Sequence, residues 1–402
     1  MAKENMSKLE RLIQQYCPDG VEYVPLSSIG TIKRGNGLQK KDFVKAGIGC
    51  IHYGQIYTKF GLFTNKTLTY VDKELADHLL HIEKGDLVIA CTSENVEDVC
   101  KAVAWLGDDS IVTGGHSCVL HHNQNPKYIA YFFQTESFQR QKRKYAYGTK
   151  VIDIKPDSIG KIEIPLPPLP VQEEIVRILD AFTELQAELQ AELQKRKQQY
   201  NYYLDNLLNF KNINRGGYQA EVRWMKIGDI CDVFTGGEVP MGSIKGNTSF
   251  GSFIYPIWGN GKDIYGYATT YQIDKDAVCI SSIGANSGAV FFHKAYFTPI
   301  IRLKVLIPRN QGISVRYLFY ILSFVGFDVK KSSVPNMNSN EVKQKVIPIP
   351  SLVEQQRIVS ILDRFDTLTT DLAQGLPAEI EKRRQQYEYY RDKLLTFKRK
   401  GA

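Results

Sequence analysis

The feature that most constrains this 402-residue chain is an internal duplication of an apolar, proline-led segment. The stretch IPLPPLPVQEEIVRILDAFTEL, starting at Ile164, matches IPIPSLVEQQRIVSILDRFDTL, starting at Ile347. After a four-residue insertion that includes Gly375, the match resumes, with KRKQQYNYYLDNLLNF from Lys195 corresponding to KRRQQYEYYRDKLLTF from Lys382. A chain that repeats itself in this way is built from two related halves.

Each copy of this segment predicts a long helix. Prolines up to Pro170 and Pro350 exclude a helix before it, and apolar residues then recur at intervals of three and four. The first helix, from Val171 to Phe210, would be about 60 Å long at 1.5 Å per residue, and the second should bend or break at Gly375 and Pro377. Because both apolar stripes are narrow, we expect the helices to pack together as an antiparallel coiled-coil spacer. The stripe residues are Ile175, Ile178, Leu179, Phe182, Leu185, Leu189, Tyr203, Leu207, Ile358, Ile361, Leu362, Phe365, Leu368, Tyr390 and Leu394.

A second duplication opens each half, where VEYVPLSSIGTIKRGNG from Val21 matches VRWMKIGDICDVFTGGE from Val222. Between the repeats lie residues 38–153 and 238–336, which do not resemble each other in sequence. Both predict mixed α/β modules, so the expected fold class is α+β, with two such modules separated by the two long helices in a pseudo-two-fold repeat. The clearest predicted strands are Gly85 to Ala90 and Ala277 to Ile283, and the clearest helices are Tyr128 to Gln139 and Val315 to Phe324.

Charge and cysteine usage indicate the kind of partner and the cellular compartment of the protein. Fifty-one Lys and Arg against forty-three Asp and Glu leave a net charge of +8, which suits a polyanionic partner without requiring one. A charged N-terminus and the lack of an 18-residue apolar window predict a cytoplasmic protein that does not associate with membranes. No CxxC pair occurs, so we expect free thiols in a reducing compartment for Cys17, Cys50, Cys91, Cys100, Cys118, Cys231 and Cys279.

Over nearly its whole length the chain resembles the specificity subunit of type I restriction-modification enzymes. The resemblance is carried by the opening LERLIQQYCPDGVEYVPL, by IPLPPLPVQEEIVRILD with its distal copy, and by the closing KRRQQYEYYRDKLLTF. In that family two target-recognition domains each bind one half of a split double-stranded DNA sequence, and two helical repeats fix the gap and dock two copies of a methyltransferase (modification) subunit. The resemblance implies that those subunits bind S-adenosylmethionine and methylate adenine, and that a motor-nuclease (restriction) subunit uses ATP and magnesium. We expect this chain itself to bind no cofactor.

The resemblance also divides the chain by position. It gives the short segment from Ser7 to Tyr16, whose apolar residues share one helical face, a place near the distal spacer. The expected parts are an N-terminal helical segment at 1–20, recognition domains at 21–165 and 213–348, and spacers at 166–212 and 349–402.

Candidate DNA contacts in the first half surround a basic, tyrosine-bearing segment, Gln139 to Lys150. Lysine and arginine neutralise phosphates and tyrosine can pack on sugars or bases, although a solvated helix end has the same composition. A second basic group flanks the turn from Gly35 to Gly37, which is itself expected to be structural. The candidates are Lys33, Arg34, Lys40, Lys41, Arg140, Lys142, Arg143, Lys144, Tyr145 and Lys150.

The second half has fewer basic candidates and more amides. Amide side chains can bind adenine edges, but a capping turn before Val342 would use the same residues. The segment from Gly259 to Gly266 lacks the spacing of a dinucleotide-binding loop and predicts a hairpin. The candidates are Lys245, Lys262, Lys330, Lys331, Asn336 and Asn338.

No catalytic or metal site emerges from the sequence. The group His116, Cys118, His121 and His122 lacks the spacing of a zinc finger. Pro156, Asp157 and Glu163 resemble part of a metal-dependent nuclease core, but Pro165 occupies the position where a lysine would be needed. There is no GxxxxGK[ST] loop for ATP and no N/D-P-P-[YFW] loop of an amino-methyltransferase. We therefore predict a non-catalytic DNA-recognition subunit, with a coiled-coil scaffold that binds proteins but not DNA as the alternative.

Overall fold

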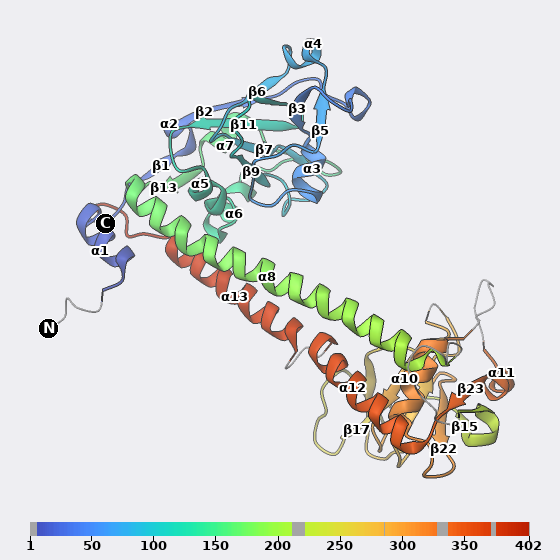
Figure 1. The fold of residues 1–402 in the computed structure, drawn as a ribbon. Coiled ribbons are helices and arrows are strands. Elements are labelled where there is room, and N and C mark those ends of the chain that lie inside the picture. The colour runs from blue at the N-terminus through green and yellow to red at the C-terminus, as the bar shows by residue number, and fades with distance from the viewer. Residues whose placement is uncertain (1–5, 211–221, 285, 328–336, 371–374, 402) are drawn as a thin grey trace. The chain divides into compact units, whose positions relative to one another are not determined.

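The computed structural model describes residues 6–210, 222–284, 286–327, 337–370 and 375–401. The chain forms two compact units, of which unit 1 comprises Met1–Leu189 with Ile380–Ala402 and unit 2 comprises Gln190–Glu379. Each unit therefore contains one mixed α/β module together with the adjoining parts of the long helices (Figure 1). The five-part division drawn from the sequence follows the repeats rather than these contacts, and it stays a prediction.

The first spacer helix is confirmed. Helix α8 (Leu169–Leu208) runs without a break for 40 residues. The distal copy forms two helices, α12 (Leu352–Thr370) and α13 (Leu376–Leu394), so the predicted break near Gly375 is also confirmed. Pro377 lies in the first turn of α13, where its missing N–H would have had no helical partner.

The long helices meet through aromatic side chains. In unit 1 Phe182 of α8 stacks on Tyr390 of α13 with 5.5 Å between ring centroids. In unit 2 Tyr203 of α8 packs on Phe365 of α12 at 5.1 Å. Since the partner's residue number falls as that of α8 rises, the helices are antiparallel, as predicted. Within the predicted stripe, Ile175, Leu179, Ile358 and Leu362 are fully buried, and the rest are half-buried except the exposed Tyr203 and Tyr390.

Unit 1 is built on a five-stranded sheet in the order β2-β11-β7-β9-β4, antiparallel except for β4. A second sheet has the order β5-β3-β10-β6, and two short pairs, β1-β13 and β12-β8, complete the module. All four residues of β7 are buried, which confirms the strand predicted there. The strands are β1 (Tyr23–Pro25), β2 (Gly30–Arg34), β3 (Ile48–Ile51), β4 (Phe63–Thr64), β5 (Thr69–Val71), β6 (Leu80–Ile82), β7 (Leu87–Ala90), β8 (Thr92–Ser93), β9 (Ala102–Trp105), β10 (Ile111–Thr113), β11 (Ser117–His122), β12 (Ile152–Asp153) and β13 (Glu163–Pro165). The helices are α1 (Lys8–Tyr16), α2 (Leu26–Ile29), η1 (Lys40–Asp42), α3 (Tyr53–Thr58), α4 (Lys73–Ala76), α5 (Pro126–Phe132), α6 (Glu136–Arg143) and α7 (Pro156–Gly160).

The single helix predicted from Tyr128 to Gln139 is in fact two helices, α5 and α6. Helix α5 ends at Phe132. The side chain of Thr135 then accepts a hydrogen bond from the Phe138 N–H and so caps the start of α6. Helical periodicity alone does not reveal such an internal cap.

Unit 2 has an antiparallel sheet in the order β15-β22-β19-β20 and a second sheet in the order β16-β18-β17-β21. The strand predicted at Ala277 and the helix predicted at Val315 are both confirmed, as β19 and α10. The elements are β14 (Arg223–Lys226), α9 (Ile227–Ile230), β15 (Cys231–Thr235), β16 (Ile244–Lys245), β17 (Tyr255–Trp258), β18 (Ile264–Ala268), β19 (Ala277–Ile280), β20 (Val290–His293), β21 (Thr298–Pro299), β22 (Lys304–Pro308), α10 (Val315–Val325), α11 (Ser339–Gln344) and β23 (Val346–Ile349).

The two modules share a common frame, although residues 38–153 and 238–336 do not resemble each other in sequence. The order β2-β11-β7-β9 in unit 1 corresponds to β15-β22-β19-β20 in unit 2. Many apolar sequences can fill a buried strand, so equivalent strands need not keep recognisable sequences. The modules differ mainly in their second sheets.

The N-terminal helix lies where the sequence analysis expected it. Helix α1 follows the capping residue Ser7, and Leu9 belongs to the same buried cluster as Leu395. In the ribbon, α1 lies beside the C-terminal end of the chain (Figure 1). Val21 N–H donates to the Lys398 carbonyl at 2.9 Å, and Lys400 N–H donates to the Val21 carbonyl at 3.1 Å. The end of the distal repeat therefore packs against the start of the first module.

The expectation of seven free thiols is wrong for Cys91 and Cys118, which form a disulfide. Cys118 lies on β11 opposite Ile89 of β7, and Cys91 follows that strand, so the two Cα atoms are 6.2 Å apart. This pairing depends on strand register, which cannot be read from the sequence for two residues separated by 27 positions. Cys17, Cys50, Cys100, Cys231 and Cys279 are free and buried.

Candidate nucleic-acid interface

In unit 1 the glycine turn after β2 is a close approach of two backbones. Gly35 N–H donates to the Ser117 carbonyl at 3.0 Å. A Cβ atom on Gly35 would lie 2.5 Å from the Gly114 carbonyl oxygen, so only glycine fits there. The structural role that we expected for this turn is confirmed.

Arg34 connects this turn to the basic segment. Its guanidinium donates to both carboxylate oxygens of Asp153, at 3.0 and 2.6 Å, and its Nε donates to the Gly115 carbonyl at 2.9 Å. The Tyr147 hydroxyl donates to the same carboxylate at 3.1 Å. Burial alone would raise the pKa of Asp153, but its hydrogen bonds with Arg34 hold the pKa below its ordinary value. The charge of Arg34 is therefore compensated within the protein, and the side chain positions the 147–153 loop.

Lys142 does not belong to an exposed basic surface, and its prediction as a phosphate contact is wrong. It shares the inward face of α6 with Phe138, and only 1% of it is exposed. Its Nζ donates to the carbonyls of Glu97 and Val99 at 2.8 and 2.9 Å. Burial lowers the pKa of Lys142 to about 8. Lys142 therefore fastens the 93–100 loop to α6.

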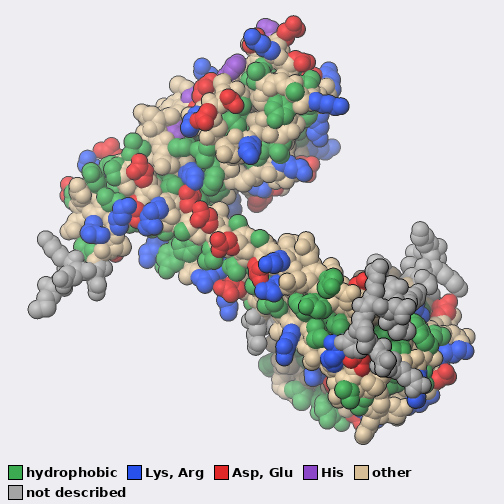
Figure 2. All heavy atoms as spheres, in the orientation of Figure 1, with side chains coloured by type: hydrophobic (Ala, Val, Ile, Leu, Met, Phe, Trp, Pro, Cys, Tyr) green, Lys and Arg blue, Asp and Glu red, His purple; other side chains and the backbone are tan. Residues whose placement is uncertain are grey.

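The remaining candidates of unit 1 are distributed over several elements. Lys33 is exposed but adjoins Arg34 on a strand, so the two side chains point to opposite faces. Tyr145 packs against the main core cluster. The exposed candidates are Lys33, Lys40, Lys41, Arg140, Arg143, Lys144 and Lys150. On the face drawn in Figure 2, basic and acidic side chains are interleaved within each unit, so charge alone does not outline the interface there.

In unit 2, Lys245 and Lys262 are exposed, and the Lys245 ammonium lies 5.4 Å from the centre of the Tyr265 ring. Asn338 caps α11, because its side-chain oxygen accepts a hydrogen bond from the Glu341 N–H at 2.9 Å. The capping alternative is thus confirmed for Asn338. Lys330, Lys331 and Asn336 lie outside the described residues.

The modules are fastened to the long helices by a duplicated polar clamp, which sequence reasoning missed. In unit 1 the Tyr131 hydroxyl of α5 and the Lys127 ammonium donate to the two oxygens of Asp180 on α8, both at 2.7 Å. Asp180 keeps its identity in the repeat as Asp363 on α12.

The equivalent clamp in unit 2 uses the same chemistry. The Tyr320 hydroxyl of α10 donates to Asp363 at 2.6 Å, and Arg316 Nε donates to it at 3.0 Å. In both modules the basic residue precedes the tyrosine by four positions, and this spacing could have indicated the clamp from the sequence.

A second matched pair of contacts supports each clamp. The hydroxyls of Tyr128 and Tyr317 donate to the carbonyls of Pro165 and Pro348, each at 2.8 Å. The fully buried amides of Gln172 and Gln355 donate to the carbonyls of Pro167 and Pro350, at 2.8 and 2.9 Å. The duplicated proline-led segment is therefore the place where each module joins its helix.

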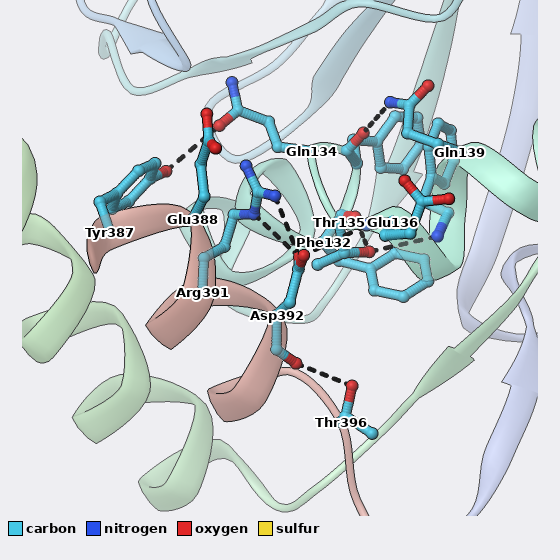
Figure 3. A network of polar contacts seen from close by, with 12 residues as sticks. Phe132, Gln134, Thr135, Glu136, Gln139, Tyr387, Glu388, Arg391, Asp392 and Thr396 are labelled. Carbon is cyan, nitrogen blue, oxygen red and sulfur yellow. Dashed lines mark hydrogen bonds and ion pairs between the residues drawn. The ribbon is translucent and has the colours of Figure 1, made fainter. Parts of the chain in front are cut away.

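Unit 1 has a further contact with α13, drawn in Figure 3. The Tyr387 hydroxyl donates to the side chain of Gln134 at 3.2 Å, and Glu136 N–H donates to Asp392 at 3.3 Å. Arg391 Nε donates to the same carboxylate oxygen at 3.1 Å. The corner between α5 and α6 is thus held by the distal repeat as well as by α8.

Within the described ranges no group of three or more His, Cys, Asp or Glu side chains could hold a metal ion. None of the helices in those ranges is apolar over a length that would cross a bilayer.

The structure contains two mixed α/β modules, each joined by a similar polar clamp to one of the duplicated helices. A sequence profile described as the type I restriction modification DNA specificity domain matches twice, over residues 18–198 and 219–382. The chain therefore belongs to the family of type I restriction-modification specificity subunits.

Individual relatives agree with this assignment. The chain is 33% identical to the EcoR124I/EcoR124II specificity subunit of Escherichia coli, over 98% of this chain and 97% of that one. It is also 33% identical to a putative type I specificity subunit of Mycoplasma pneumoniae, over 69% of this chain and 84% of that one. The fold is similar to the S subunit of a type I system from M. genitalium, with a TM-score of 0.62 at 17% identity and coverage of 94% and 96%. The prediction of a non-catalytic specificity subunit that recognises DNA is confirmed by these relatives.

Proposed function

We propose that the two modules bind the two halves of a split, asymmetric DNA target, and that the long helices set the gap between those halves. The observation that carries this proposal is the duplicated clamp of Asp180 and Asp363, which mounts two different modules on the helices in the same way. Two modules on one stiff support lose orientational freedom once, so the second half-site binds at high effective concentration.

In the same proposal the helices dock two methyltransferase subunits, and a motor-nuclease subunit joins for cleavage. Tyr202 and Tyr389 support this, because these helical aromatic side chains are 66% and 61% exposed, and tyrosine is enriched in protein interfaces. S-adenosylmethionine, ATP and magnesium would be bound by those partner subunits.

The proposal that the helices set the gap between the DNA half-sites is tested by inserting four residues, about one helical turn, between Leu185 and Leu193 of α8. The insertion adds about 6 Å of helix, or roughly two base-pair steps of 3.4 Å, so the tolerated gap should lengthen while both half-sites stay the same. Sequencing of methylated adenines in cells that express the variant with its partner subunits measures both properties. The matched control places the same four residues after the exposed Asp108, where the gap should not change. A changed half-site with an unchanged gap would refute the idea that the helices act as a ruler.

A further inference from the structure

Lys304 of unit 2 is a buried lysine with little to bind inside the protein. It is the first residue of β22, where it pairs with Thr235 of β15 and Ile280 of β19, and its exposed fraction is 6%. Its Nζ donates one hydrogen bond, to the Thr235 hydroxyl at 3.2 Å. No carboxylate among the described residues forms an ion pair with it. A buried ammonium normally has an anionic partner, because its desolvation is otherwise uncompensated.

The groups around Lys304 add positive charge and hydroxyl groups. Burial and, to a smaller extent, the charge of Arg302 lower the pKa of Lys304. Arg302 is exposed and makes no ion pair with any residue that the structure describes. The hydroxyl of Ser339 lies 3.2 Å from that of Thr235, which accepts the hydrogen bond from Lys304. Both cations therefore remain uncompensated beside a set of hydroxyl groups.

The backbone beside this cluster is held in an unusual conformation. Ile301 and Arg302 have φ values of 53° and 58°, in the left-handed region that residues other than glycine rarely adopt. Their N–H groups donate to the carbonyls of Gly237 and Gly236, at 2.9 and 3.1 Å, so the glycine turn of this module fixes them. Such conformations are retained where the surrounding structure enforces them, often at binding sites.

We infer that Lys304 and Arg302, with the hydroxyls of Thr235 and Ser339, bind a phosphate group of the DNA backbone. Lysine and hydroxyl groups suit a phosphate rather than a base edge, because an ammonium is a point charge and phosphate oxygens accept from side chains of this kind. The inference rests on the proposed function and identifies one contact by which the second module binds DNA.

The first module has no equivalent of this site. Gly35 N–H binds the Ser117 carbonyl as Gly236 N–H binds that of Leu303, so Lys304 corresponds to Cys118, which is in the disulfide. Arg34, at the position of Thr235, is neutralised by Asp153. The two modules therefore differ in how they contact the DNA backbone, although their central sheets are alike.

The test compares Lys304→Met with Lys226→Met, which removes the same charge from an exposed residue of β14. The full chain, assembled with its partner subunits, is titrated with target and non-target duplexes over a range of salt concentrations, and its unfolding in urea is followed separately. We expect Lys304→Met to weaken binding to both duplexes roughly tenfold, to lower the slope of log affinity against log salt by about 0.9, and to raise the urea midpoint. Lys304→Arg should keep the wild-type salt slope.

A lysine with only a structural role would give the opposite pattern, namely lower stability with an unchanged salt slope, and that result would overturn the inference. If Lys304→Met instead weakened assembly with the partner subunits and left DNA affinity unchanged, the site would bind an acidic surface of a partner protein. That result would also overturn the inference. If the wild-type assembly itself shows no salt-dependent binding of duplexes, the proposed function fails and the phosphate site fails with it.

Discussion

Glu174 offers a quantitative test of how burial and exposure combine in an ion pair. Its side chain on α8 is 2% exposed and accepts hydrogen bonds from Arg177 Nη2 at 2.6 Å and from Lys8 Nζ at 2.7 Å. The hydrogen bond from Arg177, aided by Lys8, lowers the pKa of Glu174 to about 2. Glu174 thereby connects α1 to α8.

The magnitude follows from this pKa and from the exposure of the partners. A carboxyl group whose pKa falls from 4.5 to about 2 would contribute roughly 3 kcal/mol to the free energy of unfolding. Because the side chains of Lys8 and Arg177 are 61% and 64% exposed, solvent screening reduces this to about 1 kcal/mol. The pKa in the folded state is below that in the unfolded state, so the stabilisation is fully present above about pH 4.5 and is lost as the pH falls toward 2.

The variant Glu174→Gln should therefore lower the free energy of unfolding by about 1 kcal/mol at pH 7, and this difference should shrink steadily below pH 4.5. Urea titration with amide exchange of peptides from unit 1 measures it, since a signal from the whole chain would mix the two units. Glu381→Gln is the matched control, because Glu381 is also paired with an arginine, Arg384, but half of its side chain is exposed. We expect no measurable change for the control. A loss at Glu174 that does not vary with pH would refute the electrostatic explanation.

Two further predictions use matched pairs of side chains. Lys142→Met should lower the free energy of unfolding by about 1–3 kcal/mol, because two carbonyls lose their donor, and should leave the salt dependence of DNA binding unchanged. Lys144→Met, at an exposed position, should leave stability unchanged and lower the salt dependence of DNA binding. A lower salt slope for Lys142→Met would instead place Lys142 at the DNA interface. Tyr131→Phe and Tyr320→Phe should each cost about 1.5 kcal/mol in urea titrations, because both hydroxyls donate to a carboxylate. The exposed Tyr389→Phe should cost nothing, and unequal losses at the two clamps would contradict their equivalence.

The parts of the fold that the sequence predicted well are those governed by local periodicity. Helix α8 was expected at Val171 to Phe210 and is found at Leu169–Leu208, and the break near Gly375 follows from proline and glycine chemistry. Helix α10 was expected to within one residue. In these segments 3.6-residue spacing and chain-breaking residues act within one stretch of chain, so a single sequence contains the necessary information.

Nonlocal contacts were missed because they depend on which segments meet. Three features depend on residues that are distant in the sequence. They are the shared sheet order, the disulfide between Cys91 and Cys118, and the clamp at Asp180. Lys142 is a different case, because its spacing of four from the apolar Phe138 places both on one helical face and could have indicated burial. Counting basic residues does not distinguish a lysine that binds carbonyls from one that faces solvent.

The two halves differ where they would meet DNA and agree where they join the helices. Asp180 and Asp363 each accept hydrogen bonds from a tyrosine and a basic residue, although Lys127 in one half is replaced by Arg316 in the other. Beside the glycine turns, by contrast, Arg34 is neutralised by Asp153, whereas Lys304 is left without a carboxylate among the described residues. The clamp holds each module on its helix in a similar way, while the surface away from the clamp can change without disturbing that attachment. This separation explains how one duplicated frame can hold two different sequence-recognition surfaces.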